Sequence, residues 1–158
     1  MQHIVEIDSY KGYGYEKSSS YVTITSYSCS YGEKIDLIIP SVIDGLPVIG
    51  IGTDDVLESN KNGWPQSIFG KYPVFRSVTI PEGVVTLNTC VFFEATVTEP
   101  VQIPSTVTYI GDRCFAYFHG EVCFSDEGNL KRIGEYAFNH TTFRGTLVVP
   151  YGVAVLER

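Results

Sequence analysis

The chain has 158 residues, of which 44% are hydrophobic and 18% charged, and this composition supports one folded domain with a sizeable core rather than a disordered chain. Its formal net charge of −7 argues against binding to nucleic acid or to an anionic membrane surface, because both need clustered basic side chains. No stretch approaches the roughly 18 apolar residues of a membrane span, so we expect no membrane insertion. Residues 1–8 have no basic segment and no long apolar run, so we expect no export signal.

Residues 1–36 are expected to form an N-terminal cap built from a β-hairpin. Residues 3–8 alternate apolar and polar side chains and residues 21–27 are rich in β-branched side chains, so both segments predict strands. Residues 10–20 are rich in Gly, Ser and Tyr and predict a turn region between them. The tyrosines of this part form either a carbohydrate-binding or peptide-binding surface or packing residues of the cap, and we favour packing.

The first repeat is expected to begin near residue 37 and to contain a turn at residues 43–47, Ile-Asp-Gly-Leu-Pro. An insertion follows at about residues 57–75 and breaks the spacing of the later repeats. Its candidate protein-binding side chains are Trp64, Phe69 and Tyr72. Insertions in repeat arrays form loops that often lie on the binding face, although these aromatic side chains have an equally weighted alternative, which is to fold back against the solenoid.

From residue 77 onward a pattern recurs every 23 residues. The recurring segments are Ile80-Pro81 and Ile103-Pro104, and residues 87–92, 110–115 and 133–138, each of which ends in Phe. A fixed period of this length indicates a solenoid in which stacked repeats share one core. Each repeat predicts two short strands separated by a proline corner, then a tight turn or single helical turn that carries the Phe inward. We therefore expect a mostly β solenoid over residues 37–158, within a single repeat domain that spans the whole chain.

Stacking of the repeats predicts ladders of inward side chains. The main ladders are Val48, Val84, Val107, Leu130 and Val153; Ile51, Leu87, Ile110, Ile133 and Leu156; Val78, Val101, Val122 and Leu147; Ile39, Ile80, Ile103, Phe124 and Val149; and Phe92, Phe115 and Phe138. The positions between the ladders form an outer surface, because neighbouring repeats keep the same orientation. Its candidate binding residues are Thr108, Tyr109, Lys131 and Arg132. Tyr109 and Arg132 are expected on the same row, one repeat apart, and both are of types enriched at binding hot spots. For any one of these residues an ordinary exposed sheet surface is the favoured alternative.

The sequence contains no constellation of catalytic or metal-binding residues. It lacks the nucleophile elbow, the phosphate-binding loop and the His-Glu-x-x-His zinc motif. Its four cysteines contain no Cys-x-x-Cys pair and are expected to be free thiols, and no histidine lies at zinc-ligand spacing from them. The acidic pairs Asp54-Asp55 and Asp126-Glu127 lack the ligand set of a calcium loop and are expected to be solvated turn residues. We therefore expect no enzyme activity and no cofactor.

These repeats share a sequence pattern, x-Ile-Pro-x-x-Val-x-x-Ile-Gly-x-x-Ala-Phe. The pattern resembles the BspA-like class of bacterial leucine-rich repeat. Residues 22–27 and 38–52 resemble the usual opening of that class. The resemblance covers about residues 21–156 and is weakest over the insertion. It implies a curved solenoid of stacked β units without catalytic residues, in proteins often displayed on bacterial surfaces and associated with adhesion to host proteins and other cells. Because no export signal is expected, display on the surface, secretion and a cytoplasmic location all stay open.

Two functions remain open on the sequence alone. In the first, the chain is a non-catalytic module that binds a protein ligand, with adhesin-like contacts to host or partner proteins. In the second, it is a structural solenoid that assembles with itself inside the cell. The second rests on the last turn, where Val153 and Leu156 have no following repeat above them, so we expect this end to pair with a second copy or a partner.

Overall fold

The computed structural model describes residues 12–28, 34–54 and 65–155. Short strands joined by turns make up these residues, and no helix occurs among them, so the predicted mostly β fold is confirmed. Accordingly, no helix in the described part of the chain is long and apolar enough to cross a membrane. The strand predicted at residues 3–8 lies outside the described residues.

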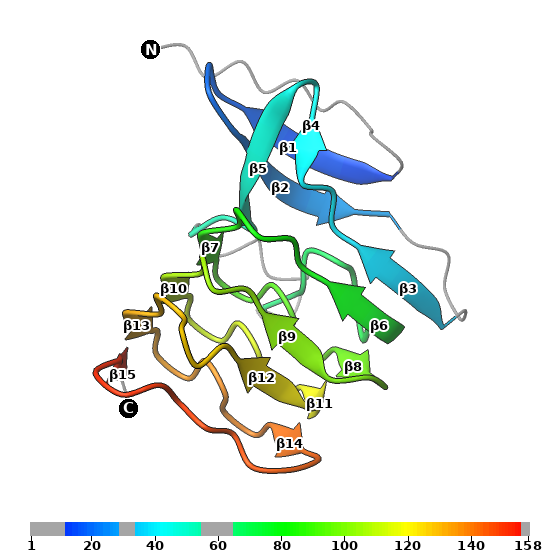
Figure 1. The fold of residues 1–158 in the computed structure, drawn as a ribbon. Helices are drawn as coiled ribbons and strands as arrows, with labels where there is room; N and C mark the ends of the chain where they lie inside the picture. Colours follow the sequence, from blue (N-terminus) through cyan, green and yellow to red (C-terminus); the bar gives the residue numbers. More distant parts are fainter. Residues whose placement is uncertain (1–11, 29–33, 55–64, 156–158) are drawn as a thin grey trace.

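The chain winds as a solenoid whose turns stack from the N-terminal hairpin at the top of Figure 1 to the last turn at its bottom. One long sheet follows the stack from end to end. Its strands are β1 (Tyr13–Lys17), β2 (Val22–Tyr27), β4 (Val42–Ile43), β5 (Leu46–Ile51), β7 (Thr86–Leu87), β10 (Tyr109–Ile110), β13 (Arg132–Ile133) and β15 (Ala154–Val155). The order is β1-β2-β5-β7-β10-β13-β15, with β4 paired to β5. From β2 onward the strands of this path are parallel, as stacked turns require.

Two smaller sheets form the other sides of the coil. The five-stranded sheet contains β3 (Ile35–Ile38), β6 (Val74–Thr79), β8 (Thr96–Val97), β11 (His119–Gly120) and β14 (Thr142–Phe143), and the two-stranded sheet contains β9 (Val101–Ile103) and β12 (Val122–Phe124). A regular turn thus has three strands, whereas the sequence predicts two. The strand not predicted is β8 in one turn, β11 in the next and β14 in the one after. These strands consist of Thr-Val, His-Gly and Thr-Phe, which share no apolar pattern from which a strand could be predicted.

The N-terminal cap is a hairpin, as predicted, but its first strand differs from the predicted one. β1 lies inside residues 10–20, for which the sequence predicts a turn, and pairs antiparallel with β2. The reason is that Tyr13 and Tyr15 are buried, with 5% and 2% of their surface exposed, so this stretch packs as a strand. β2 then pairs in parallel with β5 and joins the cap to the first turn.

β4 and β5 form a second, tight hairpin. Its two loop residues are Asp44, with φ of 53°, and Gly45, with φ of 77°, and left-handed conformations at both positions are typical of the type I′ hairpin turn. The turn predicted at residues 43–47 is therefore confirmed.

The described part of the expected insertion, residues 65–75, belongs to the solenoid instead of looping out from it. Phe69 precedes Phe92 by 23 residues and stacks on its ring, with 5.4 Å between the ring centroids. The Ser67 hydroxyl donates a 2.6 Å hydrogen bond to the Val91 carbonyl. The repeat period thus extends further toward the N-terminus than predicted.

The ladder of aliphatic side chains along the long sheet forms in the predicted register over four turns. The pairs are Ile51 with Leu87, Leu87 with Ile110, and Ile110 with Ile133, and all four side chains are at most 2% exposed. At the last turn Ile133 pairs with Val155, and Leu156, which the sequence predicts for this ladder, lies outside the described residues. Stacking of this kind gives a core that no single repeat could bury alone.

The predicted column of Phe side chains closes the other side of the core. Ring centroids lie 5.1 Å apart for Phe92 and Phe115 and 5.3 Å apart for Phe115 and Phe138, with nearly parallel planes. Phe69 extends this column by one turn. Cys114 is fully buried beside it, at the position where the next repeat has Ala137, as the sequence predicts.

The turns that carry these Phe side chains stack through main-chain hydrogen bonds that all run one way. In each case an amide donates to a carbonyl 22 residues later, and the donor and acceptor pairs are Cys90 and Asp112, Phe92 and Cys114, Glu94 and Ala116, Arg113 and Glu135, Phe115 and Ala137, and Tyr117 and Asn139. Two left-handed residues recur in each of the three turns that carry Phe92, Phe115 and Phe138. Their φ lies between 53° and 58°, at Cys90, Arg113 and Tyr136 and at Glu94, Tyr117 and His140. Stacking holds these residues in a conformation that side chains of their types disfavour.

Candidate protein-binding surfaces

One row of outward positions crosses the long sheet without a break. Successive pairing places its members side by side, in the order Thr23, Gly50, Thr86, Tyr109, Arg132 and Ala154. The next residues along the inner strands, Leu87, Ile110 and Ile133, are buried, so the side chains of this row point away from the core; Gly50 contributes only its backbone and is buried between Thr23 and Thr86. We refer to these six positions as the outer row.

Tyr109 and Arg132 form the chemically distinctive part of the outer row. They are cross-strand neighbours, as predicted, and the guanidinium carbon of Arg132 lies 5.3 Å from the centroid of the Tyr109 ring, a cation–π distance. The pKa of the Tyr109 hydroxyl is raised, mainly by partial burial and to a smaller extent by the nearby carboxylates of Asp112 and Asp54. At neutral pH this site therefore presents a neutral phenol and a cation together.

Thr108 and Lys131 precede these two residues and complete the predicted set on this sheet. Thr108 is half-buried, and its amide donates a 2.9 Å hydrogen bond to the Val85 carbonyl. Lys131 is exposed, and its amide donates to the Thr108 carbonyl at 2.9 Å. The structure thus gathers four of the seven predicted residues at one place.

The other three predicted residues do not join them. Trp64 lies outside the described residues. The prediction of Phe69 as a surface contact is wrong, because its side chain is 2% exposed and heads the aromatic column of the core. Tyr72 is 58% exposed, with the Lys71 ammonium 5.1 Å from its ring centroid, but it leads into β6 of the five-stranded sheet and not into the long sheet.

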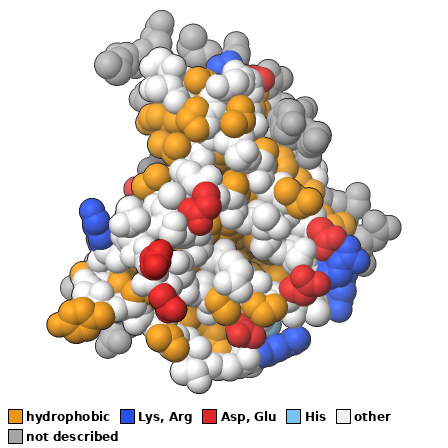
Figure 2. Space-filling model, viewed as in Figure 1, with side chains coloured by type: hydrophobic (Ala, Val, Ile, Leu, Met, Phe, Trp, Pro, Cys, Tyr) orange, Lys and Arg blue, Asp and Glu red, His pale blue; other side chains and the backbone are white. Residues whose placement is uncertain are grey.

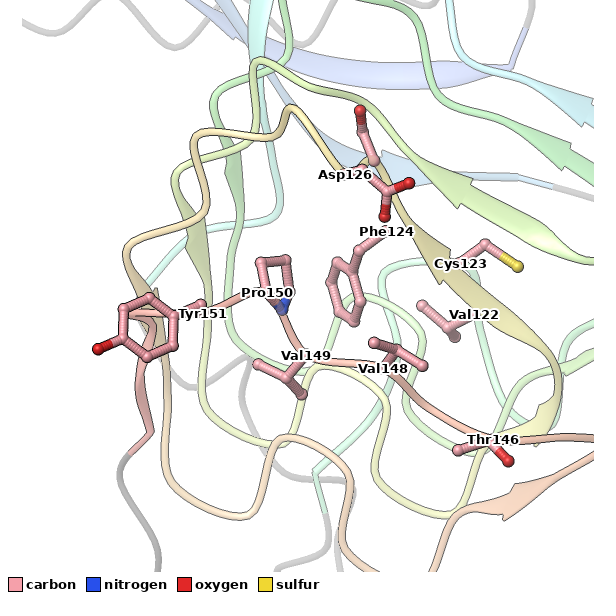
Figure 3. A pocket seen from close by; sticks show the side chains of 10 residues that line it. Val122, Cys123, Phe124, Asp126, Thr146, Val148, Val149, Pro150 and Tyr151 are labelled. Carbon is pink, nitrogen blue, oxygen red and sulfur yellow. The ribbon is translucent and has the colours of Figure 1, made fainter.

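The structure also contains a groove that the sequence analysis does not predict. It lies between β12 and the last passage of the chain, residues 146–151, and has a volume of about 430 Å³. It is lined by Val122, Cys123, Phe124, Ser125, Asp126, Thr146, Val148, Val149, Pro150 and Tyr151. Figure 3 shows β12 on one side of this space and the segment that carries Val148 and Val149 on the other. We call it the C-terminal groove.

The groove exists because the last turn is paired on only two of its three sides. β14 pairs with β11 and β15 pairs with β13, whereas the two-stranded sheet ends at β12. The ladders predicted from the sequence place residues 147–149 beside β12, but no strand pairing joins these two segments in the described chain. Val148 is instead 69% exposed.

The charge at the rim of the C-terminal groove is negative. Asp126 lines it, and none of the lining residues is basic. The Cys123 thiol donates a hydrogen bond to a Glu121 carboxylate oxygen at 3.6 Å. The pKa of this thiol is raised, mainly by partial burial and to a smaller extent by the Glu121 carboxylate. Figure 2, drawn in the view of Figure 1, shows acidic side chains spread over this face and basic side chains toward its edges.

The described cysteines and acidic residues do not form a metal site. Cys90, Cys114 and Cys123 are free thiols, and no group of three metal-ligating side chains occurs within residues 12–28, 34–54 and 65–155.

Comparison with known proteins places these features in a family. Residues 64–157 match the BspA-type leucine-rich repeat region in six copies, which is more than half of the chain. The chain belongs to the BspA-type leucine-rich repeat family. No curated protein matches its sequence.

This leucine-rich repeat protein also shares its fold with a crystal structure of the pneumococcal vaccine antigen PcpA. The two superpose with a TM-score of 0.61 at 14% sequence identity. The alignment covers 99% of this chain and 47% of the PcpA chain, so the leucine-rich repeat protein spans about half of that structure. At this identity the likeness concerns the fold alone. Family and fold together are those of a leucine-rich repeat solenoid.

Proposed function

We propose that the protein is a non-catalytic binding module that holds a partner protein along the outer row of its long sheet. The observation that carries this proposal is the unbroken row itself, with the Tyr109 and Arg132 pair near its centre. Neighbouring strands are about 4.8 Å apart, so a partner can contact side chains on several turns at once. Tyr and Arg are the types that most often supply binding energy in protein interfaces.

A photo-crosslinking experiment tests which surface the partner contacts. A benzophenone amino acid is placed at Tyr109, and in a matched variant at Thr79, which is exposed on β6 of the five-stranded sheet. Both proteins are irradiated in extract of the source cells. We expect a crosslinked protein at position 109 that is absent at position 79. Equal adducts at both positions, or none at position 109, would count against the outer row.

The proposal extends to adhesin-like contact with a host protein or another cell. The family resemblance supports it, and so does the likeness in fold to a protein described as a vaccine antigen. Protease treatment of intact source cells, followed by immunodetection, tests it. We expect the signal to disappear from intact cells, and full protection until lysis would eliminate the adhesin role.

Self-assembly is the alternative function, and one observation favours it. The last turn has exposed apolar side chains: Val148 is 69% exposed, Val149 is 37% exposed and Tyr151 is completely exposed. Clustered apolar surface of this kind often marks an interface. Light scattering over a wide range of protein concentrations distinguishes the two functions. A monomer at the highest concentration would remove the alternative, whereas growth in mass that Val148→Lys suppresses would support it.

A further inference from the structure

We propose that the C-terminal groove is a second binding site, which takes an extended segment of a partner protein. The segment adds as a strand to the free edge of β12 and carries alternating apolar and basic side chains. This site lies on the two-stranded sheet, so it does not depend on the function assigned to the outer row.

The main chain of β12 supplies the first argument. The Val101 amide donates a 2.8 Å hydrogen bond to the Glu121 carbonyl, so Glu121 and, by strand alternation, Cys123 direct their main-chain groups toward β9. The amides and carbonyls of Val122 and Phe124 then face the opposite side, where the groove lies. An unpaired row of this kind is what an added strand needs.

The lining of the groove supplies the second argument. The side chains of Val122 and Phe124 point inward from β12, and Val148 and Val149 face them across the space. Every second side chain of an added strand would point into this apolar lining, since side chains alternate along a strand. Apolar residues at those positions would bury surface that is now open.

Charge supplies the third argument, which concerns the basic side chains of the added strand. The remaining side chains of an added strand would lie alongside Cys123, on the outer side of the sheet. There the Glu121 carboxylate is 3.6 Å from the Cys123 sulfur, and Asp126 stands at the rim. No basic lining residue neutralises them, so lysine or arginine is the complementary choice.

The groove contains its own reporter for an occupancy test. Among the described cysteines, Cys90 and Cys114 are buried, whereas Cys123 is partly exposed and lines the groove. The full chain carrying Cys29→Ser is alkylated with N-ethylmaleimide in mildly alkaline buffer, and mass spectrometry follows the modification of Cys123. The probe is a short acetylated peptide of alternating lysine and valine, and the comparison peptide alternates glutamate and valine.

We expect saturating lysine–valine peptide to slow alkylation of Cys123 at least tenfold and the glutamate–valine peptide to leave it unchanged.

Two N-methylated forms of the lysine–valine peptide test strand addition directly. One form is methylated at the odd-numbered amides and the other at the even-numbered amides. One form should protect and the other should not, because only one set of amides faces β12. Asp126→Lys should weaken protection about fivefold to tenfold, whereas the same charge change at the distant exposed site, Glu16→Lys, should not.

Three results would overturn the proposal. The first is no protection by the lysine–valine peptide at millimolar concentration. The second is equal protection by both N-methylated forms, since that would show binding without strand pairing. The third is protection that rises with protein concentration when no peptide is present, which would assign the groove to a second copy of the chain.

Discussion

Phe115 is the residue whose packing best represents the core. Its ring is fully buried between Phe92 and Phe138 and meets Phe118 edge-on at 5.2 Å between centroids. We predict that Phe115→Ala lowers the free energy of unfolding, measured in urea, by about 3–5 kcal/mol. Phe138→Ala should cost less, because Phe138 is only partly buried at the end of the column. Equal losses for the two variants would contradict a column that is packed most tightly at its centre.

Asp36 is a surface residue whose ionisation depends on the fold. Its carboxylate accepts hydrogen bonds from Arg76, with Nε at 2.8 Å, and from the Ser77 hydroxyl at 2.7 Å, across the pairing of β3 with β6. These bonds, with the Arg76 contribution the largest, lower the pKa of Asp36 to about 2. The ordinary value is about 3.9, so the contact stabilises the fold above about pH 4 and is lost as pH falls through about 2.

The test is a carboxyl carbon NMR titration of Asp36. We expect a midpoint near 2 in the native protein and a return toward about 3.9 in Arg76→Gln. The same low midpoint in both proteins would show that the guanidinium does not determine the pKa.

Strands were predictable from sequence where inward positions repeat, and also in the β-branched segment that forms β2. The ladder from Ile51 to Ile133 and the Asp44-Gly45 turn follow directly from period and turn chemistry. β11 could not be predicted in this way, because its residues His119 and Gly120 become a strand only through pairing with neighbouring turns. The left-handed residues had no signal either, because stacking imposes their conformation on side chains such as Arg113.

The C-terminal groove is an element-scale feature that a disulfide experiment can probe. Cys123 pairs directly with Gln102 on β9, and the predicted ladder would have placed Val148 equally close on the other side. In a Cys29→Ser background, we predict that Gln102→Cys crosslinks to Cys123 under mild oxidation and that Val148→Cys does not, since a disulfide needs Cα atoms within about 7 Å. Equally fast crosslinking of Val148→Cys would mean that the last turn closes onto β12.

At the scale of the whole molecule, the sequence predicts the architecture and part of the proposed binding surface. Tyr109 and Arg132 were predictable as neighbours because the repeat fixes the register of the long sheet. Phe69 was misassigned because the 36 residues between Ile51 and Leu87 hide its 23-residue spacing to Phe92. The groove was unpredictable because residues 147–149 have the same pattern as strands that do pair, yet they form no strand pairing with β12.

The most direct measurement is the affinity of the crosslinked partner for two double variants of the full chain. Tyr109→Ala with Arg132→Ala removes the centre of the outer row, and Ile38→Ala with Thr79→Ala removes two exposed cross-strand neighbours of the five-stranded sheet. Because each hot-spot side chain contributes more than about 1 kcal/mol, we predict that the first pair weakens Kd at least tenfold and that the second leaves it unchanged. Equal affinities for the two variants would contradict the assignment of the outer row as the protein-binding surface.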